Sequence, residues 1–216
     1  MHGAAPPREA EFQVYLERVR TFTREVLRPA EEILEREDLI PEDIVQAMRE
    51  LGLFGITLPQ AYGGLGWSME QQVLLTMEFT QAAAAYRSRF STTIGLTSQV
   101  ILDYGTDEQR RRYLPGMASG AITGAFCLTE VEAGSDAGAV TTTAVRDGDD
   151  FLITGAKRYI TNSTDADLLM LVARTDLEST SGEGLSCFLV ERDTPGIEIP
   201  HHSAMMGQRG SHVGEI

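Results

Sequence analysis

The segment Phe126–Asp136 (FCLTEVEAGSD) brings together side chains that could take part in binding chemistry. An apolar run passes into a loop that carries the hydroxyls of Thr129 and Ser135 around Gly134. Backbone N–H groups released from sheet pairing by such a turn can point at a polar ring edge or a pyrophosphate, and the hydroxyls can add hydrogen bonds. On the residues alone, a binding loop and a plain β-bulge closed by Asp136 both stay open.

Other signatures of catalysis or metal binding are not found in the sequence. The histidines lack the i, i+4 spacing of helical ligands, so solvated turns are expected at His201, His202 and His212 and no metal is predicted. Ser135 is not surrounded by a G-x-S-x-G elbow, so a hydrolase triad is not indicated. A dinucleotide-binding glycine fingerprint is also missing.

The composition is that of a globular protein with one large or two small domains. The 216 residues carry 32 acidic and 18 basic side chains, a net charge of −14, and the one basic cluster, Arg110–Arg112, is expected to be a solvated helix face. Nucleic acid is therefore not an expected partner. Cys127 and Cys187 are too few to staple the chain, MHGAAPPREAEF has no apolar leader region, and no apolar run could span a bilayer. These features predict a cytoplasmic location.

The elements that must position the candidate loop begin with helices. Apolar residues recur every three to four positions over 12–26 (Phe12, Tyr15, Val19, Phe22, Val26), which predicts an amphipathic helix ending near Pro29. A second helix is predicted to have Pro41 in its first turn and to reach Leu51. A third is predicted to start at a Ser68/Gln71 capping box and to run through Val73, Leu74 and Met77 to Ala82–Ala85. Two more are predicted over Thr93–Tyr104 and after a Thr106/Gln109 capping box. The glycines of Leu58–Gly66 indicate a loop of close backbone turns.

Near Ile122 the pattern changes to short β-type runs. The predicted strands are Ile122–Leu128, Val140–Val145, Phe151–Thr154, Leu168–Ala173, Cys187–Val190 and Ile197–Ile199. Asp147-Gly148 predicts a hairpin turn, and Asp176–Gly184 is predicted to be a mobile surface loop. We therefore expect a helical domain over 1–120 and an antiparallel β domain over 121–216.

The order of the motifs resembles that of the acyl-CoA dehydrogenase family. Cys127–Asp136 matches position by position the family signature of a small residue, an aliphatic residue, Ser/Thr, Glu, two free positions, a small residue, Gly, Ser/Thr and Asp. Gly155–Asn162 (GAKRYITN) is similar to the family strand G-x-K-x-aromatic-I-Ser/Thr-Asn. Also similar are Pro59–Gly66 (PQAYGGLG), Tyr113-Leu-Pro115 and Met206–Ser211. Two departures are Val131-Glu132, where the family often has Pro, and Tyr159, where it usually has tryptophan.

The resemblance implies an α+β fold with an amino-terminal helical bundle followed by an antiparallel β-barrel-like domain. It also implies that FAD is the cofactor. The cofactor-binding residues that it implies are Phe126, Cys127, Leu128, Thr129, Gly134, Ser135, Tyr159, Ile160 and Thr161. Thr129 would meet the pyrimidine edge and Thr161 the flavin N5, and Ser135 would bond the FAD pyrophosphate or the pantetheine arm of the substrate.

The implied reaction is the α,β-dehydrogenation of an acyl-CoA thioester in fatty acid metabolism. A carboxylate removes the α-proton while hydride passes to flavin N5, an electron-transfer flavoprotein accepts the electrons, and the intact enzyme is a homo-oligomer. The family's catalytic base lies in a carboxy-terminal helical bundle, and Gly214-Glu215-Ile216 correspond to a strand inside the middle domain. We therefore expect a truncated chain without its own catalytic base, and neither Glu130 nor Glu132 is assigned that role.

Two alternatives stay open beside the dehydrogenase. A flavin-dependent monooxygenase or oxidase shares this scaffold and differs mainly in the region that supplies the base. A non-catalytic module that binds flavin or a partner subunit would also fit the residues.

Overall fold

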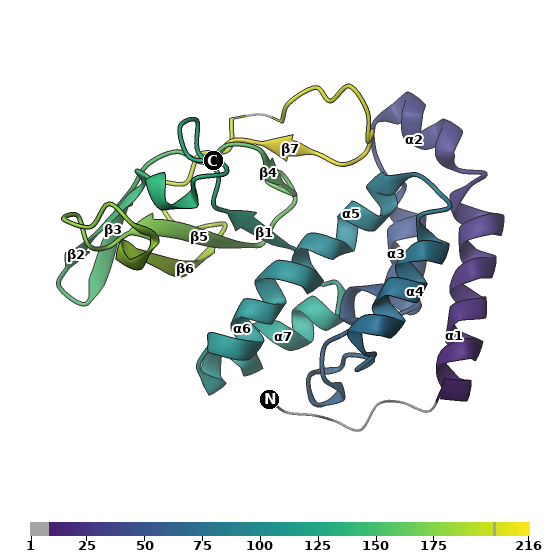
Figure 1. The fold of residues 1–216 in the computed structure, drawn as a ribbon. Coiled ribbons are helices and arrows are strands. Elements are labelled where there is room, and N and C mark those ends of the chain that lie inside the picture. Colours follow the sequence, from purple (N-terminus) through teal and green to yellow (C-terminus); the bar gives the residue numbers. More distant parts are fainter. Residues whose placement is uncertain (1–8, 201) are drawn as a thin grey trace. The chain divides into compact units, whose positions relative to one another are not determined.

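A computed structural model describes residues 9–200 and 202–216 (Figure 1). The chain separates into two compact units. We call Met1–Thr123 with Met205–Ser211 the helical unit, and Gly124–Ala204 with His212–Ile216 the sheet unit. The sequence does not indicate that Met205–Ser211 joins the helical unit, and the division into domains at residue 120 stays a prediction. The amino-terminal residues examined for a leader, up to residue 8, and His201 lie outside the described residues.

The helical unit is built from α-helices joined by short turns (Figure 1). Its helices are α1 (Glu9–Phe22), α2 (Glu31–Glu37), α3 (Glu42–Glu50), α4 (Met69–Phe79), α5 (Ala84–Thr92), α6 (Ser98–Tyr104) and α7 (Asp107–Ser119). α1 runs beside α4, and a π-helical segment, Thr93–Thr97, joins α5 to α6. Within the described residues no helix has both the length and the apolar character needed to cross a membrane.

The predicted apolar stripe of the first helix is confirmed over α1 and shifts beyond it. Phe12, Tyr15, Val19 and Phe22 are buried, whereas the last predicted member, Val26, is 39% exposed. The reason is that Thr23–Leu27 is π-helical, with a longer repeat than an α-helix, so the inward direction falls one residue later. Leu27 is fully buried in place of Val26.

Both predicted capping boxes are present. The Ser68 hydroxyl accepts from the Gln71 N–H, and the Gln71 side chain accepts from the Ser68 N–H. Thr106 and Gln109 make the same reciprocal pair at the start of α7. These boxes fix helix starts because each satisfies two N–H groups that the helix itself leaves without an acceptor.

The length predicted for the helix after Ser68 is wrong. α4 ends at Phe79, a turn covers the first alanines, and α5 starts at Ala84. Val73, Leu74 and Met77, through which the helix was predicted to run, lie on α4 and are 39–61% exposed. The buried face of α4 consists of Gln71, Leu75 and Phe79.

Two other local features of the helical unit bear on the sequence predictions. Pro41 is the residue before the first turn of α3, and the preceding helix, α2, was not predicted. The predicted close turns of Leu58–Gly66 are confirmed: a Cβ on Gly64 would lie 2.1 Å from the carbonyl oxygen of Leu58. A residue other than glycine at position 64 would therefore displace the loop backbone.

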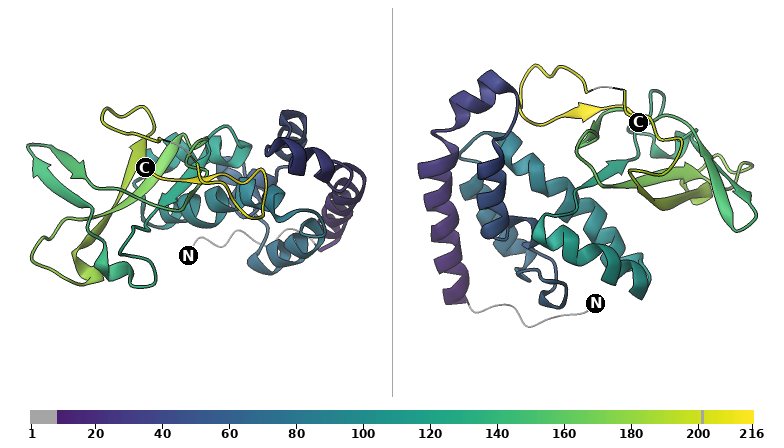
Figure 2. Two further views of the ribbon diagram at one scale, coloured as in Figure 1. Left: turned by 90° about the horizontal axis from the view of Figure 1, so that it is seen from above. Right: turned by 180° about the vertical axis from the view of Figure 1, so that it is seen from behind.

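The sheet unit contains a five-stranded sheet and a two-stranded sheet (Figure 2). Its strands are β1 (Gly124–Cys127), β2 (Thr143–Asp147), β3 (Asp150–Thr154), β4 (Ile160–Thr161), β5 (Leu168–Arg174), β6 (Leu185–Glu191) and β7 (Val213–Gly214). The order is β1-β5-β2-β3, β6 also pairs with β5, and β4 pairs with β7. The predicted hairpin is confirmed, with Gly148 in the left-handed region between β2 and β3.

The mixed topology differs from the predicted antiparallel, barrel-like domain. β5 runs parallel to both β1 and β2, and the described strands do not form a closed barrel. The β2–β3 hairpin and β4 intervene between β1 and β5, which gives the chain enough length for a parallel crossover. The strand predicted at Ile197–Ile199 is not formed, and Asp176–Gly184 is a surface segment with a 3₁₀ turn.

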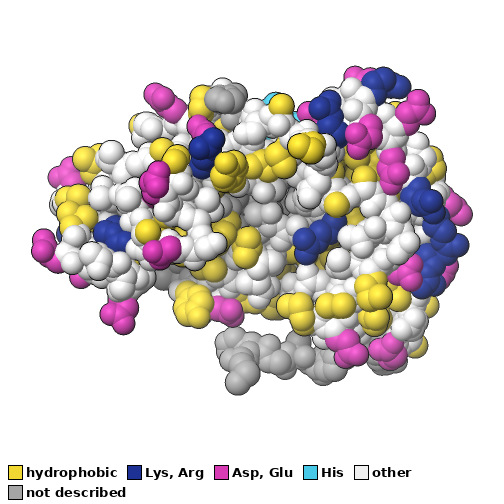
Figure 3. All heavy atoms as spheres, turned by 45° about the horizontal axis from the view of Figure 1, so that its top comes forward, with side chains coloured by type: hydrophobic (Ala, Val, Ile, Leu, Met, Phe, Trp, Pro, Cys, Tyr) yellow, Lys and Arg dark blue, Asp and Glu magenta, His cyan; other side chains and the backbone are white. Residues whose placement is uncertain are grey.

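Charged side chains are dispersed over the surface. On the face in Figure 3, acidic and basic side chains are interspersed. Arg110–Arg112 lie on α7 as a mostly exposed helix face, where Arg110 pairs with Asp107 at 3.0 Å. This arrangement agrees with the expected solvated face.

Candidate functional site

The structure brings the two predicted cofactor-binding segments together in the sheet unit. β1 contacts β4, and the loop after β1 is hydrogen-bonded to the segment before β4. The Arg158 N–H donates to the Thr129 carbonyl at 2.8 Å, and Lys157 Nζ donates to the Leu128 carbonyl at 3.1 Å. The ends of Phe126–Thr129 and Tyr159–Thr161 are therefore neighbours.

Tyr159 has an unusual backbone conformation. Its φ angle is +57°, in the left-handed region that bulky residues rarely adopt. The ring is 61% exposed, and the Arg158 guanidinium lies 5.0 Å from its centre. The next residue, Ile160, is buried, and Thr161 is half-buried. The aromatic face thus points outward while its neighbours anchor the strand.

Several hydroxyls of the predicted site have no acceptor or donor within the described chain. Those of Thr129, Ser135 and Thr161 make no hydrogen bond to another described residue, and the fully buried Ser163 hydroxyl has no partner. A buried polar group without a partner is costly, so the Ser163 hydroxyl indicates a place for a ligand or ordered water, whereas the half-buried or exposed hydroxyls of Thr129, Ser135 and Thr161 are accessible to a ligand. Neutral donors beside an aromatic ring suit a heteroaromatic ligand with acceptor atoms on its edge, which fits a flavin.

The turn that carries Gly134 and Ser135 lies apart from these bonded segments. Both residues are exposed, and a Cβ added to Gly134 would meet no atom within 4 Å. Among the described residues, no hydrogen bond joins this turn to β4. The structure therefore leaves open space beside Gly134, and Ser135 is not hydrogen-bonded to the Thr161 strand within the described residues.

Cys127 and Ile160 are the predicted site residues whose side chains are buried, and Cys127 is 0% exposed. Burial raises the pKa of its thiol to about 12. The side chain points into a small apolar cluster with Ala125, Ile160 and Leu169. Cys127 could thus meet a ligand only through its backbone.

The signature glutamate, Glu130, is the centre of a buried hydrogen-bond network. Its carboxylate accepts from the N–H and hydroxyl of Thr141 at 2.7 and 2.6 Å, and from the N–H and hydroxyl of Thr142 at 3.0 and 2.5 Å. Lys157 Nζ is the fifth donor, at 2.7 Å. Burial alone would raise the pKa of Glu130, but Lys157 and the threonine donors outweigh burial and lower this pKa to about 2. Burial lowers the pKa of Lys157, and Glu130 opposes that effect.

Sequence reasoning missed the roles of Thr141, Thr142 and Lys157 in this network. The available signals were the threonine run after the signature and the single lysine of the chain. Gly155 belongs to the same arrangement, because a Cβ there would lie 2.3 Å from the Thr142 hydroxyl oxygen. The first glycine of the GAKRYITN motif thus leaves room for a donor to Glu130.

Arg174 ties two loops to the end of β5. Its guanidinium donates to the carbonyls of Gly138 and Val140 at 2.5 and 3.1 Å, and to that of Ser179 at 2.6 Å. The first loop follows the Ser135 turn, and the second is the segment predicted to be a mobile surface loop. Hydrogen bonds donated by the Arg174 side chain to main-chain carbonyls therefore hold both loops.

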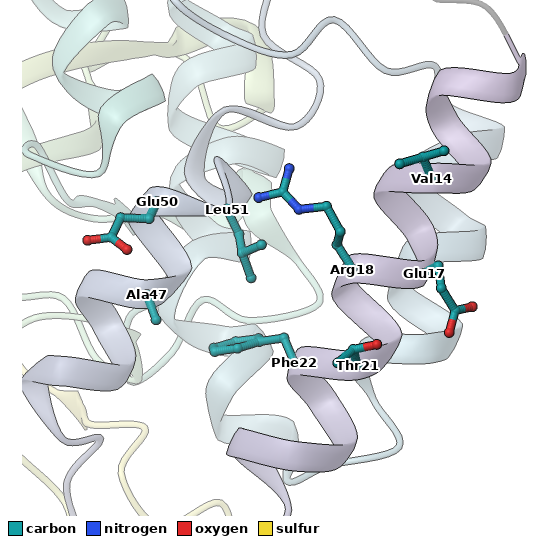
Figure 4. A pocket seen from close by; sticks show the side chains of 8 residues that line it. All are labelled: Val14, Glu17, Arg18, Thr21, Phe22, Ala47, Glu50 and Leu51. Atoms are coloured by element: carbon teal, nitrogen blue, oxygen red, sulfur yellow. The ribbon is translucent and has the colours of Figure 1, made fainter.

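A separate groove of about 640 Å³ lies in the helical unit between α1 and α3 (Figure 4). Arg18 reaches from α1 toward α3 across it. Its lining residues are Val14, Glu17, Arg18, Thr21, Phe22, Ala47, Glu50 and Leu51. None of the predicted site residues lines this groove.

The histidines expected in solvated turns can be followed only in part. His202 and His212 stack with ring centres 4.3 Å apart. The expectation that the histidines bind no metal stays a prediction.

Fold and site together define an α+β protein whose candidate ligand-binding residues lie in its sheet unit. The chain belongs to the acyl-CoA dehydrogenase family: the family described as "Acyl-CoA dehydrogenase, N-terminal domain" matches residues 9–121, and "Acyl-CoA dehydrogenase, middle domain" matches residues 125–216. The resemblance predicted from the motifs is thus confirmed.

Individual relatives cover almost the whole chain. An acyl-CoA dehydrogenase of Bacillus subtilis (strain 168) is 36% identical over 198 residues, 92% of this chain and 52% of the relative. The structure of a glutaryl-CoA dehydrogenase from Mycobacterium smegmatis in complex with FADH2 has a TM-score of 0.87 at 31% identity, and the match covers 96% of this chain and 52% of that one. The prolyl acyl carrier protein oxidase AnaB has a TM-score of 0.88 at 29% identity, with coverage of 97% and 56%. The chain therefore spans about half the length of these relatives.

Proposed function

We propose that this chain forms the flavin-binding part of an FAD-dependent acyl-CoA dehydrogenase, which oxidises an acyl-CoA thioester to the trans-2-enoyl-CoA. The observation that carries the proposal is the pairing of two segments with free hydroxyls. The Arg158 N–H bond to the Thr129 carbonyl holds Phe126–Thr129 beside Tyr159–Thr161. The membership of the family supports the same reading.

The proposed roles follow from the exposure and bonding of each group. Bound FAD would supply the hydride acceptor. The Thr129 and Thr161 hydroxyls, free of other partners, would donate to the ring edge, and the exposed Tyr159 ring would cover a face of it. Phe126, Cys127 and Leu128 would offer backbone groups, with Ile160 as buried support. Gly134 and Ser135 would contact the pyrophosphate or the pantetheine arm.

The proton acceptor is proposed to lie outside this chain. A general base works best when its pKa lies near the operating pH. Glu130 has a pKa of about 2 and five hydrogen-bond donors around its carboxylate, so it is too weak a base for the α-proton of a thioester. Glu132 is exposed and has no donor that would orient it in the described structure. Both are therefore left without a catalytic role.

The test is flavin binding followed by reduction. The full-length protein is saturated with FAD, and flavin absorbance is followed after anaerobic mixing with acyl-CoA substrates of different chain lengths. Bleaching of the flavin with formation of an enoyl-CoA is the expected result. FAD binding without reduction by any acyl-CoA would refute the reaction, and a lack of FAD binding would refute the site.

An oxidase is the second candidate, favoured by the similarity to the prolyl acyl carrier protein oxidase. The dehydrogenase and the oxidase differ in the electron acceptor that reoxidises the flavin. We propose an electron-transfer flavoprotein as the acceptor, acyl-CoA as the substrate, and a homo-oligomeric, cytoplasmic enzyme of fatty acid metabolism. Rapid oxygen consumption coupled to substrate oxidation, without any added acceptor protein, would instead support the oxidase.

A further inference from the structure

Lysine occurs once in this chain, and it is buried. Of the 18 basic residues, 17 are arginines and only Lys157 is a lysine. Its side chain is 1% exposed, and that of its partner Glu130 is 5% exposed. A compact ammonium can direct its donors to closely spaced acceptors, whereas the planar guanidinium of arginine needs a wider space. The one lysine of the chain is thus a buried ammonium paired with a buried carboxylate.

The Lys157 ammonium bonds the Leu128–Glu130 segment, and two further segments are joined to it through Glu130 and through the main chain of Lys157. Lys157 Nζ donates to the Leu128 carbonyl at 3.1 Å and to Glu130 at 2.7 Å. Glu130 in turn accepts from Thr141 and Thr142. The backbone N–H and carbonyl of Lys157 both pair with Ile216, at 2.7 and 3.0 Å. Residue 157 is consequently fixed by its side chain and by its main chain.

The left-handed tyrosine lies two residues beyond this anchor. Such a conformation persists only where the surroundings determine it, and it is a typical feature of functional sites. Lys157 and Arg158, the two residues immediately before Tyr159, supply that constraint, because both are hydrogen-bonded to the 128–130 segment. Thr161, whose hydroxyl has no partner in the described structure, lies two residues after Tyr159.

We propose that Lys157 is a positioning residue which, through Glu130 and Leu128, fixes the spacing between Phe126–Thr129 and Tyr159–Thr161 so that both segments meet one flavin ring. This inference rests on the proposed function. Lys157 itself touches neither the ring nor the substrate; it acts through the residues on either side.

The test uses variants of the full-length protein in which the charged side chains are replaced by uncharged ones, so that an effect on FAD binding can be distinguished from an effect on stability. Lys157→Met leaves Glu130 buried without its cation, whereas the double variant Lys157→Met/Glu130→Gln removes both charges and should recover much of the thermal stability. We expect both variants to bind FAD at least about tenfold more weakly. At saturating FAD, both should also show altered visible absorption and circular dichroism of the flavin.

A control in the same unit is Phe151→Ala. Phe151 of β3 packs on Phe188 of β6 with ring centres 5.1 Å apart, and no side-chain hydrogen bond joins either described residue to Glu130 or Lys157, so this variant should lose stability alone. Wild-type FAD affinity and flavin spectra in the double variant would overturn the positioning role while leaving the proposed function intact. A wild-type protein that binds no FAD would overturn both.

A second measurement needs no variant, should the substitutions prevent folding. In full-length protein labelled with ¹⁵N at the lysine side chains, the ammonium signal of Lys157 should be recognised by its protection from solvent exchange, because this side chain is 1% exposed. We expect this signal to shift when FAD is added and to stay protected from solvent exchange. An ammonium signal that is the same with and without bound FAD would contradict the proposal.

Discussion

The ammonium of Lys157 lies 2.7 Å from a carboxylate oxygen of Glu130, and the two residues are 27 positions apart in the chain. Both come from motifs by which the chain resembles its family. Each alone would be a costly buried charge, and together with Thr141 and Thr142 they form a hydrogen-bonded group in which the carboxylate accepts from five donors. The structure thus gives the signature glutamate an architectural role.

Stability should fall in acid because of Glu130. Its pKa is about 2 in the folded protein and has an ordinary value of 4.5, so its contribution is fully present above about pH 4.5 and is lost as the pH falls toward 2. A difference of this size corresponds to about 3 kcal/mol. Urea unfolding of the wild type and of Glu130→Gln, measured from pH 7 to pH 3, should give a difference in unfolding free energy that shrinks with acid. A constant difference would show that Glu130 does not titrate in this way.

Gly155→Ala should destabilise the sheet unit by about 1–3 kcal/mol, because the new methyl group would displace Thr142 from Glu130. The measurement is the free energy of unfolding in urea. The matched control is Gly182→Ala, where an added Cβ meets no atom within 4 Å. Equal stability of the two variants would argue against the close contact.

Gly64→Ala should destabilise the helical unit by a similar amount, about 1–3 kcal/mol. The added Cβ would lie 2.1 Å from the Leu58 carbonyl oxygen, and backbone on both sides would have to move. Gly95→Ala is the control: it lies in a helical segment with open space, so it should be neutral or stabilising. Circular dichroism during thermal unfolding tests both, and a Gly64 variant as stable as the Gly95 variant would refute the expectation.

The two cysteines should differ in reactivity. Cys187 is exposed, whereas Cys127 is buried with a pKa of about 12. A thiol reagent at neutral pH should therefore label one cysteine in the native protein and both in denaturant, as counted by mass spectrometry. Cys127→Ser should keep the native label and Cys187→Ser should lose it; native labelling of Cys127 would contradict the described core.

Local signals explain why some elements could be predicted. The Ser68/Gln71 and Thr106/Gln109 boxes and the Asp147-Gly148 turn depend only on residues within a few positions of each other, and all three are present. The exposed position of Val26 and the parallel pairing of β5 with β1 could not be predicted in the same way. The first depends on a π-helical turn and the second on a crossover around the β2–β3 hairpin.

For the candidate site too, some features could be predicted from the sequence and others could not. Thr129 and Thr161 were identified by resemblance, and the structure brings their segments together through a bond from Arg158 to Thr129. The hydrogen bond from Lys157 to Glu130 was not predicted, because the two residues are 27 positions apart and form no local sequence pattern. The assignment of the nine cofactor-binding residues stays a prediction that ligand binding must test.

The central claim is that the sheet unit holds a flavin between its two hydroxyl-bearing segments. Titration of the full-length protein with FAD, followed by flavin absorbance, tests this most directly when the wild type is compared with Thr161→Ala. We expect saturable binding by the wild type and, for Thr161→Ala, FAD binding or flavin reduction weakened about tenfold, as expected for one lost hydrogen bond. Identical binding and reduction in the two proteins, or no binding by the wild type, would contradict it.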